Sequence, residues 1–280
     1  MGLIIRQYLL FIRSKLYFLC WLNVVKAINK SVARKKKTNL SGLPEDIEHS
    51  METRWNQNYS VNQQYDLSEV HESFLTETLD AHTKMMLVDG PAGSSKTYLS
   101  VLASLLMLGR GEVDKIIYVR SIIESASRSL GSLPGDLDEK FSPWVMPLAE
   151  KVEELLSDAD AVHLMKSKNV ECIPVNFARG LTFKRSAVII DEAQNMTQSE
   201  ITTLLTRFGQ NSKYMLLGDT AQSDINGRSG FIPTLNAFDT KKSKDMGIYT
   251  VKFTKNEIVR SPILHHIVDV VEKIPKVTKT

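Results

Sequence analysis

The residues with the clearest chemical capacity lie in one short segment, Gly-Pro-Ala-Gly-Ser-Ser-Lys-Thr-Tyr at positions 90–98. Such a loop wraps a polyphosphate with backbone N–H groups, because the helix that follows presents its positive N-terminal end. In this pattern the lysine reaches the β- and γ-phosphates and the threonine hydroxyl holds magnesium. The residues predicted to bind the nucleotide are Gly90, Pro91, Ala92, Gly93, Ser94, Ser95, Lys96, Thr97 and Tyr98.

One position in this loop departs from the usual pattern, which has glycine before the lysine. This chain has Ser95 there. Because the particular advantage of glycine is its access to positive φ, a serine is tolerable there if the residue has an ordinary negative φ.

A second set of chemical groups follows the apolar run 187–190, where Asp191 and Glu192 are adjacent. In this Walker B pattern Asp191 suits the magnesium ion and its water shell, and Glu192 suits the orientation of an attacking water. The separation between Lys96 and Asp191 leaves room for intervening βα units before the chain returns beside the first strand.

A third apolar run ends at Asp219, and Gln222 follows it closely. Ligands of open α/β sheets bind outside the carboxyl ends of the strands, so both side chains are expected to face the same crevice. Gln222 would then sense the γ-phosphate. The alternative is that Asp219 and Thr220 form an ordinary turn.

The elements that must position these residues alternate between short apolar runs and amphipathic segments, which is typical of an α/β fold with a mostly parallel sheet and helices on both faces. The expected strands are 84–89, 115–120, 170–175, 187–191, 214–218 and 248–253. The expected helices are 95–108, 143–156, 198–208 and 262–273, whereas the lysines at 241, 242 and 244 are expected in a solvated loop.

Charge divides the chain unevenly. The 280 residues carry 35 basic and 32 acidic side chains, but residues 1–40 hold nine of the bases and no acid, which leaves residues 41–280 with a net charge of −6. We therefore expect a basic, apolar leader (1–40), a polar linker or irregular arm (41–65) and a catalytic domain (66–280). The leader is either an arm for nucleic acid or a membrane surface, or an extension that does not belong to the native protein.

Membrane insertion and disulfide bonding are not expected. The longest uncharged stretch of the leader, residues 16–25, is shorter than the roughly 20 apolar residues that span a bilayer. The two cysteines, Cys20 and Cys172, are far apart and suggest neither a zinc site nor a disulfide framework. A reducing, cytoplasmic location fits this composition best.

Taken together, these motifs resemble those of the PhoH family, P-loop ATPases similar to the first RecA-like half of superfamily 1 helicases and named for induction by phosphate starvation. The resemblance covers roughly residues 65–275, in a short form that looks most like the versions carried by bacteriophages. It rests on the segments 90–97, 130–140, 179–182, 191–195, 218–222 and 259–262.

Three further positions depart from the family pattern. Ser121 follows Arg120 where the family usually has proline, and Leu181 replaces a frequent second arginine. The nearest match to the glutamine with which helicase-like relatives read adenine is His71, so base specificity is not determined by the sequence.

The resemblance implies ATP hydrolysis with magnesium, in which Lys96, Asp191, Glu192 and Gln222 act with an arginine. Arg260 matches the arginine motif of the family, and Arg120 is the second candidate. The chain is too short for a second RecA-like domain, so we expect a neighbouring subunit to close the site in a homo-oligomeric ring, a hexamer.

The expected task is movement on single-stranded RNA or DNA, with the loop 122–135 and the segment near Arg179, Lys184 and Arg185 as candidates for lining a pore. The alternative is a nucleotide-dependent binding or assembly module, in phosphate stress or phage infection, with little turnover.

Overall fold

Six parallel strands form the centre of the computed structural model, which describes residues 61, 66–121, 137–223, 225, 227–259, 263, 266, 267 and 270, with the backbone alone for 137–144. The predicted leader and, apart from Val61, the predicted linker lie outside these residues, as do Arg260 and the loop 122–135. The described residues belong to the unit Thr53–Thr280, which is one of two into which the chain divides.

The sheet has the order β3-β2-β4-β5-β1-β6, and all its neighbouring strands pair in parallel. The prediction of a mostly parallel sheet is confirmed, and each expected strand agrees with an observed one to within a residue at either end. One expectation was wrong: β4 does not lie beside β1, because β5 is inserted between them. The strands are β1 (Met85–Asp89), β2 (Lys115–Arg120), β3 (Val170–Pro174), β4 (Ser186–Asp191), β5 (Lys213–Gly218) and β6 (Ile248–Lys252).

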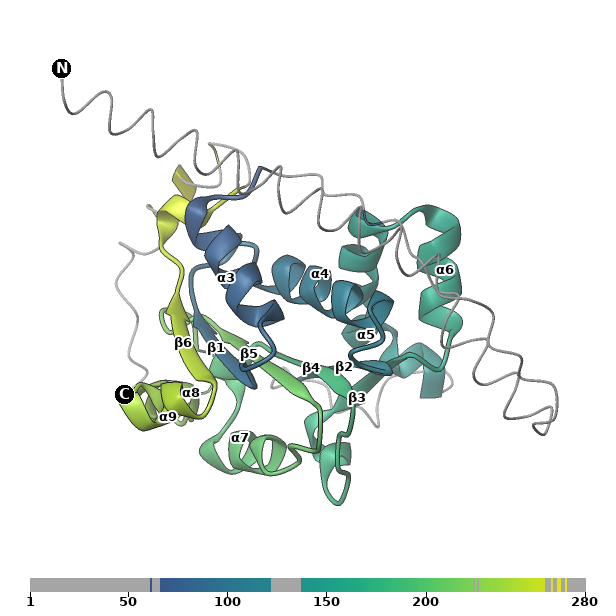
Figure 1. Ribbon diagram of the computed structural model, residues 1–280. Helices are drawn as coiled ribbons and strands as arrows, with labels where there is room; N and C mark the ends of the chain where they lie inside the picture. Colours follow the sequence, from purple (N-terminus) through teal and green to yellow (C-terminus); the bar gives the residue numbers. More distant parts are fainter. Residues whose placement is uncertain are drawn as a thin grey trace. The chain divides into compact units, whose positions relative to one another are not determined.

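Helices cover both faces of the sheet (Figure 1). One face carries α3 (Glu69–Leu79), α4 (Lys96–Gly109), α5 (Leu137–Leu155) and α6 (Asp158–Lys166). The other carries α7 (Gln198–Leu205) and α8 (Phe231–Phe238). The remaining short elements are η2 (Val175–Ala178), η3 (Ala193–Asn195), α9 (Lys241–Asp245) and η4 (Lys255–Glu257).

The predicted helices agree only partly with these elements. The two predicted at 95–108 and 143–156 correspond to α4 and to most of α5, but the third ends at Leu205 instead of 208, and most of 262–273 lies outside the described residues. The predicted solvated loop at 241–244 is instead the short helix α9, because the Thr240 side chain caps its first turn by accepting from the Ser243 N–H at 3.2 Å.

Alternate side chains of each strand feed two separate cores. Met86 and Val88 of β1 pack under α3 and α4, whereas Met85 and Leu87 pack toward α7 and α8. Both faces are therefore buried, which explains why the central strands read as unbroken apolar runs. Among the described residues, no helix is both long and apolar enough to cross a membrane.

Candidate nucleotide-binding site

The phosphate loop connects the carboxyl end of β1 to the N-terminus of α4, as the sequence predicts. Two of its residues are left-handed: Gly93 with φ 82° and Ser95 with φ 62° and ψ 17°. The condition under which serine would be tolerated without strain, a negative φ, is therefore not met. The loop needs this conformation to turn into α4, and a serine there stores about 1–2 kcal/mol of backbone strain that glycine would avoid.

The base of the loop is packed against the upstream helix and the last strand. A Cβ added at Gly90 would lie 2.7 Å from the Cβ of Phe253, so the close approach requires glycine. His71 of α3 is fully buried, makes an edge contact with the Phe253 ring, and its Nε2 lies 3.3 Å from the Ser94 carbonyl oxygen. His71 therefore supports the loop from below and, being buried, is not placed to read a base.

Lys96 extends over the loop that precedes it. Its ammonium group donates to the carbonyl oxygens of Gly90 at 2.6 Å and Pro91 at 2.9 Å. Burial lowers the pKa of Lys96, and the carboxylates of Asp219, Asp191, Glu192 and Asp89 oppose that shift. The cavity therefore holds a cation on one side and several carboxylates on the other. This arrangement suits a polyphosphate bound with a metal ion, because the cation attracts the phosphates and the carboxylates attract the metal.

Thr97 and Asp191 meet at the start of α4 and the end of β4. The Thr97 hydroxyl donates to Asp191 Oδ2 at 3.0 Å, and the buried Tyr118 hydroxyl donates to the same oxygen at 2.7 Å. Burial, followed by the Asp191 charge, raises the pKa of Tyr118, so this phenol stays a neutral donor. A hydroxyl and a carboxylate oxygen in contact are suitable ligands for Mg²⁺, which usually binds only one or two protein oxygens together with phosphate oxygens and water.

Glu192 is held by two neighbours and by its own backbone. Gln194 Nε2 donates to Glu192 Oε2 at 2.6 Å, and an Arg120 amine lies 3.5 Å from Oε1. The residue itself has a left-handed φ of 56°. Backbone strain of this kind persists only where the surrounding structure enforces it, and it is concentrated at functional sites.

The end of β5 completes the site through Gln194. The Gln194 Oε1 accepts from the Asp219 backbone N–H at 3.1 Å, so one amide bridges Glu192 to the neighbouring strand end. Asp219 is buried, its Oδ2 has no partner among the described residues, and burial raises its pKa. Its neighbour Thr220 bonds Asp89, with a hydroxyl distance of 3.0 Å. The turn alternative is thus also realised, since Asp219 Oδ1 accepts from the Ala221 N–H at 2.9 Å.

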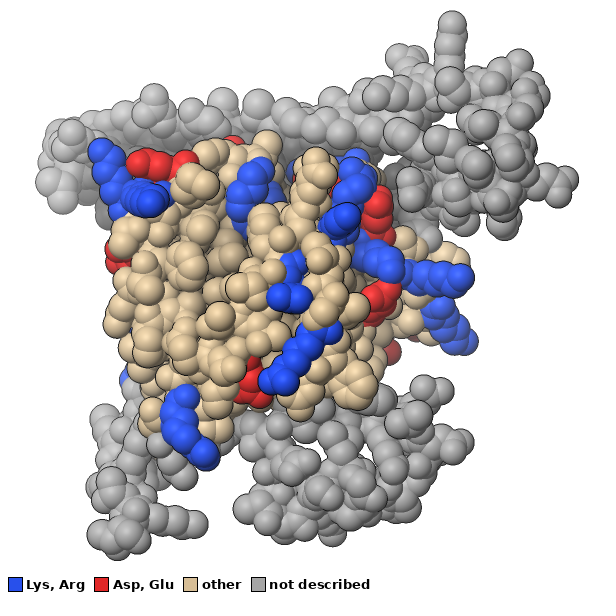
Figure 2. All heavy atoms as spheres, turned by 90° about the horizontal axis from the view of Figure 1, so that it is seen from below, with Lys and Arg blue, Asp and Glu red and all other residues tan. Residues whose placement is uncertain are grey.

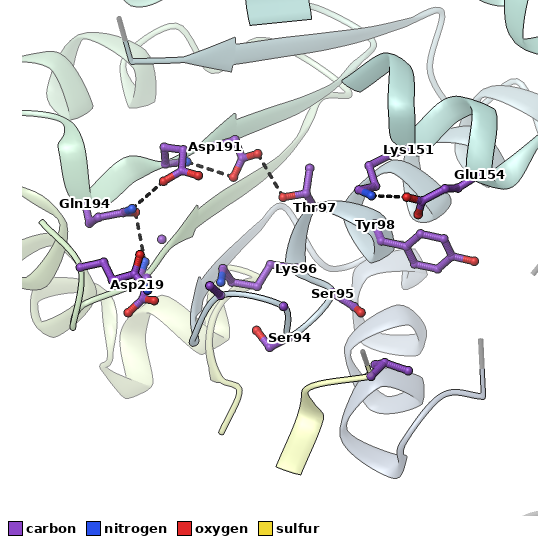
Figure 3. Close-up of a pocket in the computed structure, with 16 residues that line it drawn as sticks. Ser94, Ser95, Lys96, Thr97, Tyr98, Lys151, Glu154, Asp191, Gln194 and Asp219 are labelled. Carbon is purple, nitrogen blue, oxygen red and sulfur yellow. Dashed lines mark hydrogen bonds and ion pairs between the residues drawn. The ribbon is translucent and has the colours of Figure 1, made fainter. Parts of the chain in front are cut away.

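These groups line one cavity of about 210 Å³ at the carboxyl ends of the strands. Figure 3 shows Lys96 in its middle, with Gln194 and Asp219 to one side and Tyr98, Lys151 and Glu154 to the other. The predicted site residues on its wall are Ala92, Gly93, Ser94, Ser95, Lys96, Thr97, Tyr98, Asp191, Glu192 and Gln222. Gly90 and Pro91 contribute the carbonyls that Lys96 binds, and the predicted Arg260 lies outside the described residues.

Other residues of the site were missed from the sequence. Lys151 and Glu154 of α5 form an ion pair on the cavity wall, but an amphipathic helix gave no signal that distinguished them. Gln194 lies inside the segment 191–195 on which the family resemblance rests, yet only the fold shows that its amide links two strand ends.

The parallel sheet with a phosphate loop after β1 and paired carboxylates after β4 defines a RecA-like P-loop NTPase fold. Residues 68–272 match the family described as PhoH-like protein, and the chain belongs to that family. A PhoH-like protein of Bacillus subtilis (strain 168) is 37% identical over 186 residues, which is 66% of this chain and 57% of that protein. Protein PhoH of Escherichia coli (strain K12) is 33% identical over 184 residues, 64% of this chain and 51% of that one.

The chain spans about half the length of the curated relatives it matches. Among solved structures, the large terminase of a thermophilic bacteriophage in complex with ADP has a TM-score of 0.46 at 12% identity and covers 73% of this chain and 50% of that one. Pif1 helicase from Candida albicans has a TM-score of 0.35 at 16% identity, over 75% and 45% of the two chains. Likenesses at this level add nothing to the case that the site itself makes.

Proposed function

We propose that this protein binds ATP with Mg²⁺ in the cytoplasm and hydrolyses it at the cavity between the phosphate loop and the ends of β4 and β5. The observation that carries this proposal is the convergence of Lys96, Thr97, Asp191 and Glu192 on one cavity, although the last two are far from the first two in sequence. Transfer of a phosphoryl group needs mainly positioned charge, and these residues supply it.

Each group has a distinct part in the reaction. On binding ATP, the Lys96 ammonium group exchanges its hydrogen bonds to the Gly90 and Pro91 carbonyl oxygens for bonds to phosphate oxygens. The new bonds are stronger because both partners are charged. Mg²⁺, held by Thr97 and Asp191, would neutralise charge on the β- and γ-phosphates. Glu192 orients the attacking water, and Gln222 on the cavity wall senses the γ-phosphate.

Two parts of this proposal go beyond the single chain. An arginine must meet the developing negative charge, and Arg260 or Arg120 supplies it. We propose further that a neighbouring copy closes the site in a homohexameric ring and that turnover is coupled to single-stranded RNA or DNA. Light scattering during size exclusion with ATP and Mg²⁺ tests the ring, and a strict monomer with full turnover would contradict it.

The central experiment measures ATP turnover with and without single-stranded RNA or DNA. We expect Lys96→Ala and Glu192→Gln each to reduce turnover by roughly a hundredfold or more. The exposed Glu150→Gln on α5 serves as the control for loss of a carboxylate and keeps the wild-type rate. Wild-type turnover in Glu192→Gln would refute the role of that carboxylate in positioning water.

One observation favours a second candidate, a nucleotide-dependent binding or assembly module. Both Glu192 oxygens are already engaged, one by Gln194 and one by Arg120, so the carboxylate must be released before it can position water. Tight ATP binding with negligible turnover in the presence of every oligonucleotide would support this module over the motor.

A further inference from the structure

A second hollow lies on the face of the sheet that α7 and α8 cover, between α7 and the segment that follows η2. This α7 groove has a volume of about 530 Å³ and is lined chiefly by Arg179, Gly180, Ser199, Thr202, Thr206 and Arg207. None of its lining residues is acidic, and none carries a fully apolar side chain. Figure 2 shows this side of the molecule, where Lys and Arg side chains cross the middle and Asp and Glu lie mainly toward the edges.

Two loops that continue from the groove-lining residues Gly180 and Arg207 are bonded to each other. The Phe183 N–H donates to the Arg207 carbonyl oxygen at 3.0 Å, and the Arg185 N–H donates to the Gln210 carbonyl oxygen at 2.9 Å. The loops approach so closely that a Cβ at Gly209 would lie 2.2 Å from the Phe183 carbonyl oxygen. The groove is therefore held in place by the fold, and a ligand need not order it.

The charge in the groove lacks internal compensation. Arg179 is exposed and forms no ion pair within the part of the chain that the structure describes. Arg207 donates to two neutral acceptors, the Leu181 carbonyl oxygen at 3.4 Å and the Thr206 hydroxyl at 3.3 Å, and its buried Nε has no acceptor among the described residues. The acid of α7, Glu200, is turned to the helix N-terminus, where it accepts from the Thr197 N–H at 2.8 Å. The groove thus presents unneutralised guanidinium donors beside exposed hydroxyls of Ser199 and Thr202.

Apolar side chains are exposed close to this cationic hollow. Phe177 of η2 is 66% exposed, Leu181 42% and Phe208 38%. Guanidinium groups along a groove with aromatic rings beside it are the combination that binds unpaired nucleotides, since the backbone phosphates meet the cations and the bases stack on the rings. A duplex hides its bases and would leave the rings unused.

We propose that the α7 groove binds the phosphodiester backbone of a single-stranded nucleic acid, with Arg179 and Arg207 each on a phosphate. This inference rests on the proposed nucleic-acid coupling and gives it a place on the molecule. The net charge of −6 over residues 41–280 does not oppose it, because the local field of the groove is positive. The groove is also close in sequence to the hydrolysis site, since α7 begins at Gln198, soon after Glu192.

The test uses two double variants. The groove variant combines Arg179→Gln and Arg207→Gln. The matched α6 variant combines Lys166→Gln and Lys168→Gln, which removes two exposed charges near the end of α6. Fluorescence anisotropy with labelled single-stranded RNA and, separately, DNA is measured over a series of salt concentrations. We expect the groove variant to bind about tenfold more weakly. Its slope of log affinity against log salt should fall by about 1.4, because each phosphate contact to a single strand contributes about 0.7. The α6 variant should keep the wild-type affinity and slope.

The other outcomes overturn the proposal in distinguishable ways. If the wild type binds an oligonucleotide and the groove variant binds it equally well with the same slope, the groove assignment fails and the proposed function stands. If the wild type binds neither RNA nor DNA, the coupling to nucleic acid fails with it. If the groove variant instead changes the oligomeric state in light scattering, the groove is a contact between copies.

Arg207→Lys, which keeps the charge, is expected to retain most of the salt slope and guards against misfolding of the double variant.

Discussion

In the nucleotide cavity Lys96 faces several buried or half-buried carboxylates, whereas in the α7 groove Arg179 is exposed and no acidic side chain lines the wall. The cavity is drawn from the ends of β1, β4 and β5, so its geometry depends on the whole sheet. The groove depends on one helix and two loops. We therefore expect nucleotide binding in the cavity to depend on orientation at short range, and the proposed binding of nucleic acid in the groove to depend on accumulated charge that salt can screen.

The largest difference between the cavity and the groove is expected when one side-chain hydroxyl is removed from each, because this change leaves the charge of both regions unaltered. Tyr118→Phe removes the 2.7 Å hydrogen bond to Asp191 and should raise the Mg²⁺ concentration for half-maximal turnover by about tenfold, because groups behind a metal ligand set its orientation. Tyr214→Phe is the matched control, since the buried Tyr214 hydroxyl has no partner among the described residues. In the groove, Thr202→Val should change oligonucleotide affinity less than about twofold. An unchanged Mg²⁺ requirement in Tyr118→Phe would contradict the orientation argument.

An intermediate effect concerns loss of stability in acid, which is expected from the buried His71 beneath the phosphate loop and not from the α7 groove, whose lining has no histidine. Burial lowers the pKa of His71 from its ordinary value of 6.5, so below that pH the unfolded chain binds more protons than the folded one. Stability is therefore lost as the pH falls through 6.5 toward the folded pKa. The melting temperature of the wild type should fall more between about pH 7.5 and about pH 5.5 than that of His71→Gln.

The exposed His82 supplies the comparison for this experiment. His82→Gln removes an exposed imidazole instead of a buried one and serves as the matched control for loss of a histidine. An identical pH dependence of the melting temperature in the wild type and in His71→Gln would mean that protonation of the His71 ring does not cause the loss of stability in acid.

The smallest effect is expected from relieving the strain at Ser95. Ser95→Gly removes a side chain from a left-handed residue but also loosens the unfolded chain, so the free energy of unfolding should rise by only about 0.5–1 kcal/mol. Asn211→Gly, at φ 56°, is the control, because asparagine tolerates this conformation better and should gain less. A chemical denaturation curve measures both, and a loss of stability in Ser95→Gly would show that the serine hydroxyl holds the loop.

Much of this molecule was readable from its residues. Apolar runs identified the six strands, and the runs are unbroken in the central ones because a strand covered on both faces has no polar side. Lys96 with Thr97 marked the phosphate loop. The helices were harder: α3 was not predicted, although Ser68 and His71 carry its capping signal, and His71 was considered only as the nearest match to an adenine-reading glutamine. The ion pair of Lys151 and Glu154 left no signal, because charges spaced along a helix are ordinary on any exposed face.

Residue types and local order were enough to predict the fold class, the family and the membership of Lys96, Thr97, Asp191 and Glu192 in one site. Tertiary structure alone decided that β5 stands between β4 and β1, that Gln194 joins two strand ends, and that Ser95 is left-handed. It also brought Arg179 and Arg207 to one groove. The physical reason is common to all four: each depends on which distant segments pack together, and packing is settled by the burial of the whole core rather than by neighbours along the chain.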